Sequence, residues 1–419
     1  MRVLSVGRRF GALFFPLSLF LFVFISSSSH AAGPIDGAKA SGMGTAFTAV
    51  ADDPSAMAVN PAGLTQIKGI EVYGGSAVLV PSTGFTSSSG QKEDTKFQAF
   101  FPPTLYISAA PGVRDLRLGL GVFSAYGIGG RKWDPAGLTR YISVKGQLAT
   151  IEINPTVAYR LTPALSIGVG ADYLLSRSEA EKMVDQSAFG APDGTLRMKG
   201  FGDGWGYNLG VLFKPIDKLS LGIAYRSRIS VNQTGHIHLE NIAPALQSAF
   251  GGQQFSTGIS EPVTYPDDLT IGLAYRPDGR LALALDFERV GWSSFGQAVI
   301  DLEQQVPQAG FNNIVLPLDW KDVWWIKLGA DYKVSDLLSL RAGYAYIPSP
   351  VPDETLDPSN PDSDENNFSL GAGIHKGATT VDLFYMADFY EERSVNNSIL
   401  SGNYTNFVNF AGFDVGRKF

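Results

Sequence analysis

The side chains that most often carry catalysis are scarce in this sequence of 419 residues. Of its four histidines, His236 and His238 open a polar segment that we expect to be a long loop, and His375 stands beside a short predicted turn. A serine hydrolase would place a serine and a carboxylate at the depth of a histidine, and none of these three has such partners. A His-x-His pair also falls short of the three or four ligands of a zinc site. We therefore predict that the protein is not an enzyme and holds no metal or cofactor.

The overall charge argues against partners that require a basic surface. The chain carries 33 lysines and arginines against 40 aspartates and glutamates, a formal net charge of −7. Nucleic-acid binding depends on basic residues that neutralise phosphates, so we expect no nucleic-acid partner. Cysteine is absent, which rules out disulfides and thiolate ligands and agrees with an exported protein that needs neither.

The first 31 residues have the features of an export signal rather than of a folded segment. Arg2, Arg8 and Arg9 form a basic start, and an apolar run over residues 10–25 follows. Small residues then suit cleavage after Ala31. A membrane anchor is disfavoured because the run is shorter than the ~20 residues that a spanning helix needs. We predict a cleaved signal peptide over residues 1–31.

The elements that would position any site repeat with a period of two. In residues 165–173, 219–226, 269–276 and 338–344, apolar side chains alternate with small or polar ones. Successive side chains of a strand point to opposite faces, so each segment has one apolar face and one polar or small face. Glycine is plentiful (47 residues) while charged residues make up only 17% of the chain. This composition favours many short strands in one large sheet.

Fourteen segments have the composition and alternation of strands. They lie near residues 70–81, 97–110, 115–126, 145–160, 164–177, 196–213, 218–233, 263–276, 280–290, 320–333, 336–347, 367–376, 379–391 and 404–419. Short connections such as 160–163 and 276–280 alternate with long polar ones such as 234–262 and 291–319. This sorting is typical of outer-membrane barrels, and a soluble β-sandwich has no reason to show it. We predict an all-β fold, a transmembrane antiparallel β-barrel of about 14 strands over residues 70–419.

A closed barrel is the form of sheet that a membrane requires. Lipid supplies no hydrogen-bond partners, so an open sheet edge would leave backbone groups unsatisfied at several kcal/mol each. The last segment alternates to the end of the chain and finishes at Phe419. A terminal aromatic residue resembles the signal that barrel-assembly machinery reads, so we expect Phe419 to be an assembly signal and that machinery to be a partner. Arg417 departs from the pattern, and we expect it to reach toward the periplasmic interface.

Residues 32–69 do not have the pattern of a strand. They are rich in Gly and Ala, and Asp53 followed by Pro54 predicts a helix start with Asp53 as the N-cap and Pro54 at the first helical position. Asn60-Pro61-Ala62-Gly63 would end that short helix and lead into the first strand. About 40 residues are too few for a core of their own, so we expect a hatch that plugs the barrel from inside. A disordered periplasmic tail is the alternative, which the low charge and apolar content disfavour.

Short motifs along the chain carry more information in their order than singly. In the predicted hatch these are Gly42-x-Gly44, Ala51-Asp52-Asp53-Pro54-Ser55 and Asn60-Pro61-Ala62-Gly63-Leu64. Later motifs are Tyr126-Gly127, Asn154-Pro155, Trp292-Ser293-Ser294-Phe295, Ser349-Pro350-Val351-Pro352 and the terminal Phe419. Together they resemble the FadL/TodX family of outer-membrane transporters for long-chain fatty acids and aromatic hydrocarbons. The resemblance covers essentially the whole chain after the signal peptide. Its hatch motif consists of Gly42, Gly44, Asp52, Asp53, Asn60, Pro61, Ala62 and Gly63.

The resemblance implies a transporter without an open water channel, placed in the bacterial outer membrane. In this family a hydrophobic ligand lands among the extracellular loops, enters a pocket in the barrel, and leaves sideways through a gap at a kink in the third strand. The third predicted strand here carries Gly119, Gly121, Tyr126 and Gly127, and glycine in a strand often marks a bulge or bend. The same glycines could equally be small inward-facing residues, and the sequence leaves both interpretations open.

Apolar residues in one long loop are candidate ligand contacts. Ile242, Leu246 and Phe250 share one face of a short predicted helix, and Phe255 follows it. An exposed apolar patch would suggest a surface that first receives the ligand. Packing of this loop against its neighbour explains the same residues equally well.

Further candidate contacts lie in the hatch and inside the barrel. The resemblance places Phe47 in the hatch and Gly33 and Pro34 at the mature N-terminus, nearest the pocket. Arg160 and Arg341 face inward by alternation and are candidates to meet a fatty-acid carboxylate. An ion pair inside the lumen is the stronger expectation for both arginines.

The sequence thus predicts an outer-membrane transporter of hydrophobic small molecules, most of all long-chain fatty acids, by pocket binding and lateral release. Its expected partners are such a ligand and outer-membrane lipid. The alternatives are an uptake channel for aromatic hydrocarbons or alkanes, a general porin, and a surface receptor or adhesin. A porin would line its lumen with charge and would lack a hatch. Ligand uptake and ion conductance separate these alternatives.

Overall fold

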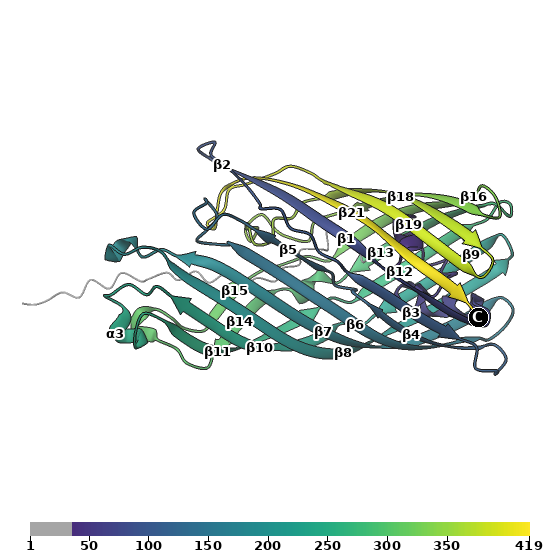
Figure 1. Ribbon diagram of the computed structural model, residues 1–419, viewed down its shortest axis with the longest axis horizontal. Helices are drawn as coiled ribbons and strands as arrows, with labels where there is room; N and C mark the ends of the chain where they lie inside the picture. The colour runs from purple at the N-terminus through teal and green to yellow at the C-terminus, as the bar shows by residue number, and fades with distance from the viewer. Residues whose placement is uncertain (1–35) are drawn as a thin grey trace, which may run out of the picture.

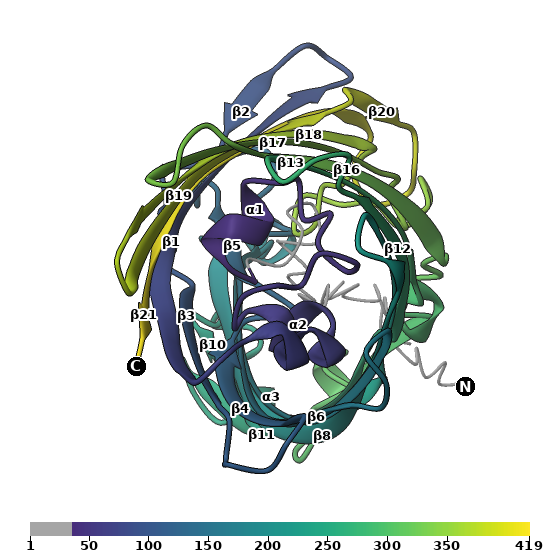
Figure 2. The same ribbon diagram turned by 90° about the vertical axis from the view of Figure 1, so that its right-hand side faces the viewer.

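The computed structural model describes residues 36–419, which form one closed antiparallel barrel with the N-terminal segment inside it (Figures 1 and 2). The predicted signal peptide and the candidate contacts Gly33 and Pro34 lie outside the described residues. Fourteen strands close the barrel, and 7 additional strands are short outer elements or the second halves of interrupted barrel strands. The predicted all-β barrel of about 14 strands is therefore confirmed.

Most barrel strands are continuous, and three are interrupted. The continuous ones are β1 (Ile70–Ser87), β3 (Pro103–Ala109), β6 (Lys145–Arg160), β7 (Leu165–Val184), β8 (Gly194–Ile216), β13 (Leu281–Val290), β16 (Val323–Lys333), β17 (Leu338–Ile347), β18 (Glu365–Lys376), β19 (Thr379–Tyr390) and β21 (Gly402–Lys418). The interrupted ones are β4 (Leu116–Phe123) with β5 (Ile128–Lys132), β9 (Leu219–Arg226) with β10 (Ile229–Glu240), and β12 (Asp268–Tyr275) with β11 (Phe255–Tyr265). Outside these lie β2 (Lys92–Asp94), β14 (Gln297–Leu302), β15 (Ile314–Pro317) and β20 (Arg393–Val395). The barrel closes where β1 pairs with both β3 and β21.

The two ends of the barrel differ in their connections (Figure 1). The C-terminus and the short turns lie at one end, while β2, β14, β15 and the short helix α3 (Gln247–Phe250) lie at the other. Several strands run further toward the long-loop end than their apolar residues predicted. His236 and His238, predicted to open a loop, lie within β10, which pairs with β8 and β11 on either side. The prediction was wrong because backbone pairing continues where the apolar alternation fades.

The outward face of the barrel is apolar where a membrane would surround it. Large apolar residues with 40% or more of their surface exposed include Leu105, Val169, Leu209, Ile223, Ile271, Leu328, Leu370 and Phe413. Such a belt would be unstable in water, and it is the lipid-facing surface of an outer-membrane barrel. None of the helices in residues 36–419 is long and apolar enough to cross a membrane.

The hatch lies inside this barrel, as Figure 2 shows from the short-turn end. It contains α1 (Ala38–Ser41), α2 (Ala56–Val59) and the 3-10 helix η1 (Pro61–Gln66). The predicted helix start was wrong in its cap. Ser55 is the N-cap of α2, and Asp53 instead accepts hydrogen bonds from the Ser55 amide and hydroxyl at 2.8 and 2.5 Å. Asn60 then caps η1, which stands between α2 and the first strand.

Small residues on the inner wall make room for the hatch backbone. A Cβ atom at Gly343 on β17 would collide with the backbone of Gly44, and one at Gly222 on β9 would collide with the Thr48 carbonyl. Gly44 itself has a φ of 63°, a conformation that favours glycine. The small residues that alternate with apolar ones in the sequence therefore mark the wall on which the hatch is seated.

Candidate functional site

Asn60 fixes the hatch to itself and to the barrel wall. Its side-chain amide donates to the Thr48 carbonyl at 2.8 Å and to the Val211 carbonyl, on β8, at 3.1 Å. Its carbonyl oxygen accepts from the Ala62 amide at 3.2 Å, and the residue is fully buried. One side chain thus binds three backbone groups, two in the hatch and one on the barrel wall.

A second anchor comes from the wall itself. The Asp286 carboxylate on β13 accepts hydrogen bonds from the amides of Phe47 and Thr48 at 3.0 and 2.9 Å. The Phe47 ring is fully buried among residues of the hatch and small residues of the barrel wall, and its centroid lies 5.8 Å from the Lys39 ammonium. The candidate contact Phe47 therefore packs inside the hatch.

Buried charged residues, which we call the charged belt, lie between the hatch and the part of the lumen toward the long-loop end. The Arg226 guanidinium lies 2.9 Å from Glu152 and 3.2 Å from Asp172, and it also donates to the Ala58 carbonyl in the hatch at 2.7 Å. Lys327 on β16 donates to the Glu288 carboxylate at 2.5 Å. Both cations of this belt are therefore already paired with acids, and the belt holds the upper surface of the hatch.

The two arginines singled out from the sequence lie at the periplasmic end. Arg341 is buried and donates to Asp382 at 2.7 Å, with Asp331 at 3.5 Å. Arg160 donates to the Thr65 carbonyl of the hatch. The ion pair expected for Arg341 is present, whereas Arg160 holds the hatch and forms no ion pair within residues 36–419.

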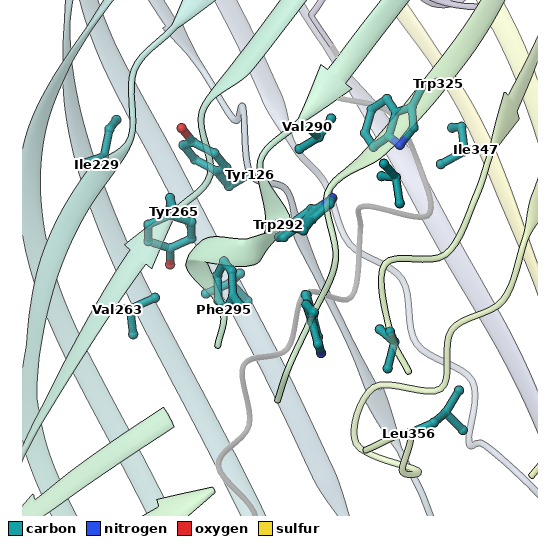
Figure 3. Close-up of a cluster of buried hydrophobic side chains, with 14 of the residues drawn as sticks. Tyr126, Ile229, Val263, Tyr265, Val290, Trp292, Phe295, Trp325, Ile347 and Leu356 are labelled. Carbon is teal, nitrogen blue, oxygen red and sulfur yellow. The ribbon is translucent and has the colours of Figure 1, made fainter. Parts of the chain in front are cut away.

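Above the charged belt, the lumen is filled by buried aromatic and aliphatic side chains (Figure 3). We call this set the aromatic cluster. Its rings belong to Phe85, Tyr126, Trp133, Tyr265, Trp292, Phe295, Trp320, Trp325 and Tyr404, with aliphatic neighbours such as Ile229, Val263, Val290 and Ile347. Ring centroids lie 5.3 Å apart for Trp292 and Trp320 and 5.2 Å apart for Phe295 and Trp320. The cluster draws on strands all round the barrel, so it forms the apolar centre of the lumen.

Two cavities border the aromatic cluster. The first has a volume of about 50 Å³, lies between the cluster and the hatch, and is lined by Asp36, Thr48, Tyr126, Arg226 and Lys327 among others. The second has a volume of about 10 Å³ and is lined by cluster tryptophans and by the loop that precedes β18. Tyr126 belongs to both the cluster and the first cavity.

The third barrel strand is interrupted beside Tyr126. Phe123 at the end of β4 pairs with Glu152, and Ile128 at the start of β5 pairs with Ala149. The four residues 124–127 on this strand therefore oppose only two on β6, which makes a bulge that we call the break. Pairing of β4 with β3 also stops there, with Val122 opposite Leu105.

The break turns Tyr126 into the lumen. Its ring centroid lies 4.7 Å from that of Tyr265, and its hydroxyl donates to the Pro266 carbonyl at 3.3 Å. Gly127 follows with a φ of 84°. The geometry places the interruption in strand pairing directly beside the apolar lumen.

The four residues proposed for a kink do not act together. Gly119 and Gly121 lie in the regular part of β4, paired on both edges. A Cβ atom at Gly119 would lie 2.6 Å from the Met57 sulfur, so this glycine makes room for the hatch. Only Tyr126 and Gly127 stand at the break, and the sequence alone could not separate the two pairs.

The apolar loop residues pack against a neighbouring loop. Ile242, Phe250 and Phe255 are buried and Leu246 is partly buried, in a cluster with Phe311 and residues of β14. The rings of Phe250 and Phe255 lie 5.9 and 5.6 Å from that of Phe311. The helix α3 covers only the last part of the predicted helical face. Loop packing, rather than an exposed patch, is what the structure shows.

The remaining residues singled out from the sequence lie near the periplasmic turns. The His375 ring nitrogens lie 3.4 Å from the Ser339 and Thr380 hydroxyls. Over residues 36–419, no three His, Cys, Asp or Glu side chains are grouped so that they could hold a metal ion. Arg417 donates to the Thr379 hydroxyl at 2.7 Å, and the Phe419 side chain is 74% exposed at the barrel rim.

The closed barrel, apolar outer belt, internal hatch and apolar lumen define a plugged β-barrel of the bacterial outer membrane. The chain belongs to the family described as outer membrane protein transport protein (OMPP1/FadL/TodX), whose sequence profile matches residues 22–415. This is a family of transporters rather than of enzymes. The protein is accordingly an outer-membrane transporter for hydrophobic molecules.

The chain is similar both to a protein named for long-chain fatty acids and to one named for toluene. It is 25% identical to the long-chain fatty acid transport protein of Escherichia coli O6:H1, over 83% of this chain and 84% of that protein. It is 24% identical to a putative outer membrane protein of Neisseria meningitidis serogroup B, over 91% of both chains. Among solved structures, a FadL homologue of Pseudomonas aeruginosa matches with a TM-score of 0.81 and 20% identity, over 91% of this chain and 98% of that one. The toluene transporter TodX of Pseudomonas putida matches with a TM-score of 0.73 and 20% identity over the same shares. The structural likeness shows the shared fold, and the comparisons do not distinguish fatty acids from aromatic hydrocarbons.

Proposed function

We propose that the protein takes up long-chain fatty acids, which bind in the aromatic cluster and leave sideways through the break. The observation that carries this proposal is the position of Tyr126, which belongs to the aromatic cluster and also stands at the interruption of the wall. A ligand beside Tyr126 would therefore already be next to the part of the wall that has to open toward lipid.

The position of the hatch favours a sideways exit, because the hatch lies across the axial path through the barrel. Asn60, Asp286 and Arg226 each bind backbone groups of the hatch. Displacing the hatch would break all these buried hydrogen bonds, each worth about 0.5–1.5 kcal/mol net, or about 1.5–3 kcal/mol where a charged side chain takes part. At the break, by contrast, regular strand pairing has already ended. The path through the wall is thus the less costly one.

The aromatic cluster would bind apolar ligands of many kinds by burying their hydrocarbon surface. Burying a hydrocarbon chain gains roughly 25 cal/mol per Å² of apolar surface removed from water. The high content of aromatic rings also favours a second candidate substrate, aromatic hydrocarbons, whose rings would stack on Trp292, Phe295 or Trp320. We further propose that the exposed Phe419 serves barrel assembly, and that Asn60 and Pro61 belong to the part of the hatch that adjusts during release.

Removing the break tests the exit. Deleting Ser124 and Ala125 leaves two residues opposite two on β6, so that β4 and β5 can join as one paired strand. We expect this variant to bind oleate within about threefold of wild type and to lose about tenfold or more of oleate uptake by cells. In the deletion variant Tyr126 follows Phe123 directly and turns outward by strand alternation. Tyr126→Ala is the matched control, because it also removes the Tyr126 ring from the lumen but keeps the break.

Two outcomes would count against the proposal. Uptake by the deletion variant at the wild-type rate would exclude the break as the exit. Steady ion conductance of the purified protein in planar bilayers, without saturable binding of oleate or toluene, would indicate a porin instead. Saturable binding of toluene but not of oleate would select the second candidate substrate.

A further inference from the structure

The small cavity at the upper edge of the aromatic cluster combines apolar and polar walls. Its volume of about 10 Å³ suits one group of the size of a water molecule. One wall consists of Trp292, Trp320 and Trp325, which belong to the aromatic cluster. The other wall contains Asn360, Asp362, Ser363 and Glu365. We call this cavity the slot.

Glu365 is the unusual residue of the slot. It lies on the inner face at the start of β18 and is fully buried. Neither of its carboxylate oxygens accepts a hydrogen bond from residues 36–419, and the Ser363 hydroxyl in the same wall also lacks a partner there. Tyr390 faces Glu365 across the strand pair and interacts with its carboxyl, but the two groups do not meet hydrogen-bond geometry. A buried acceptor without a donor costs roughly 1–3 kcal/mol, and more when it is charged, so a donor placed in the slot is stabilising.

The surroundings of the slot are acidic. Asp388 lies one pair deeper on the inner face of β19 and accepts from Asn367 at 2.5 Å. Asp362 accepts from the Ser349 hydroxyl at 2.6 Å, and burial raises the pKa of its carboxyl against the opposing effects of Ser349, Arg393 and the buried Arg131. No ion pair joins Glu365 to a cation in the described part of the chain. An ionised carboxylate in the slot would add a further negative charge to these acids at low dielectric, which is unfavourable.

We propose that the slot receives the head group of the transported amphiphile as a neutral O–H donor, a hydroxyl or an un-ionised carboxyl, with Glu365 as the acceptor. The tail then packs among the rings of the aromatic cluster, which the slot adjoins. This inference rests on the proposed function and names the chemical form of the ligand. It makes Glu365 the acceptor for the head group, while the surrounding acids disfavour ionised head groups.

Binding measurements with matched C18 ligands test the slot. The probes are oleyl alcohol, which has a donor, methyl oleate, which has none, ionised oleate, and oleylamine, which is cationic. In the wild type we expect oleyl alcohol to bind about tenfold more tightly than methyl oleate, as one buried hydrogen bond would give. Glu365→Leu removes the acceptor, so the preference for the alcohol should vanish while the affinity for methyl oleate is kept. Glu365→Gln keeps an uncharged carbonyl acceptor, so the preference for the alcohol should remain. Ionised oleate should bind this variant more weakly than the alcohol, because Asp362 and Asp388 are unchanged.

The control is Glu354→Leu, the same change at an exposed position of the loop that precedes β18. It should leave every affinity unchanged. Equal binding of the alcohol and the ester by the wild type would overturn the inference, since the slot would then hold water alone. Retention of the alcohol preference in Glu365→Leu, or tightest binding of oleylamine, would also overturn it. Binding of methyl oleate in all variants would still support hydrophobic transport, whereas no binding of any probe would refute both proposals.

Discussion

Replacement of Asn60 by alanine should loosen the hatch without unfolding the barrel. The change removes two donors and one acceptor, and it leaves the Thr48 carbonyl and the Ala62 amide without this partner, while Val211 keeps its pairing within the sheet. At roughly 1–3 kcal/mol for each buried group left unsatisfied, partial relaxation and hydration still leave a cost of about 3 kcal/mol. Since about 1.4 kcal/mol corresponds to a factor of ten, the ratio of seated to unseated hatch should fall about 100-fold.

Hydrogen exchange followed by mass spectrometry measures this loosening directly. Peptides that cover residues 44–66 should exchange up to about 100-fold faster in Asn60→Ala, while β18 and β19 should exchange as in the wild type. Single barrels in planar bilayers should show brief openings that the wild type lacks. Asn396→Ala, at an exposed loop position, is the control and should show neither effect. Unchanged exchange in the hatch together with a closed barrel would refute the assignment of Asn60 as an anchor.

Two further substitutions probe the interior. Gly343→Ala should push the hatch away from β17 and raise ion conductance, because the new Cβ would collide with Gly44. Gly279→Ala is the control and should leave conductance unchanged, because its Cβ would meet nothing within 4 Å. Equal conductance of the two variants would refute the seating of the hatch on this wall. Arg226→Met leaves the buried carboxylates of Glu152 and Asp172 without their cation. The free energy of unfolding should therefore fall by about 3–5 kcal/mol, as measured by thermal unfolding. A melting temperature equal to that of the wild type would show that this charged belt does not support the fold.

The barrel could be predicted from the sequence because membrane strands leave a periodic record. Residues 165–173 alternate strictly, and they form part of β7 with the apolar side chains turned outward. The short turn at 160–163 connects β6 to β7 as expected. Local alternation and turn residues suffice here because each strand pairs with its sequence neighbours.

The break was not visible in the same pattern. Gly119 and Gly127 look alike in sequence, yet only the register against β6 shows that extra residues lie between Phe123 and Ile128. Register belongs to a pair of strands, so no property of one segment reveals it.

The slot was missed for a related reason. Inward positions of a barrel strand are commonly polar, so Glu365 looked like any other residue of the inner face. Glu365 differs from those residues because it lines a cavity together with Trp292 and Trp320. These tryptophans lie far away in sequence and come to the same cavity only when the barrel closes. The loop residue Phe250 shows the converse, because an apolar side chain in a long loop found a partner in Phe311.

The most direct test of the account is whether the aromatic cluster holds the ligand. Native mass spectrometry of delipidated protein, titrated with oleate and with toluene, would compare the wild type with Trp320→Ala and Trp205→Ala. Trp320 is 6% exposed and lies in the cluster, while Trp205 is 66% exposed on the outer face of the barrel. We predict saturable binding to the wild type and to Trp205→Ala, and binding weakened about tenfold in Trp320→Ala. Equal binding by all three proteins, or no saturable binding by any of them, would contradict a ligand site in the lumen.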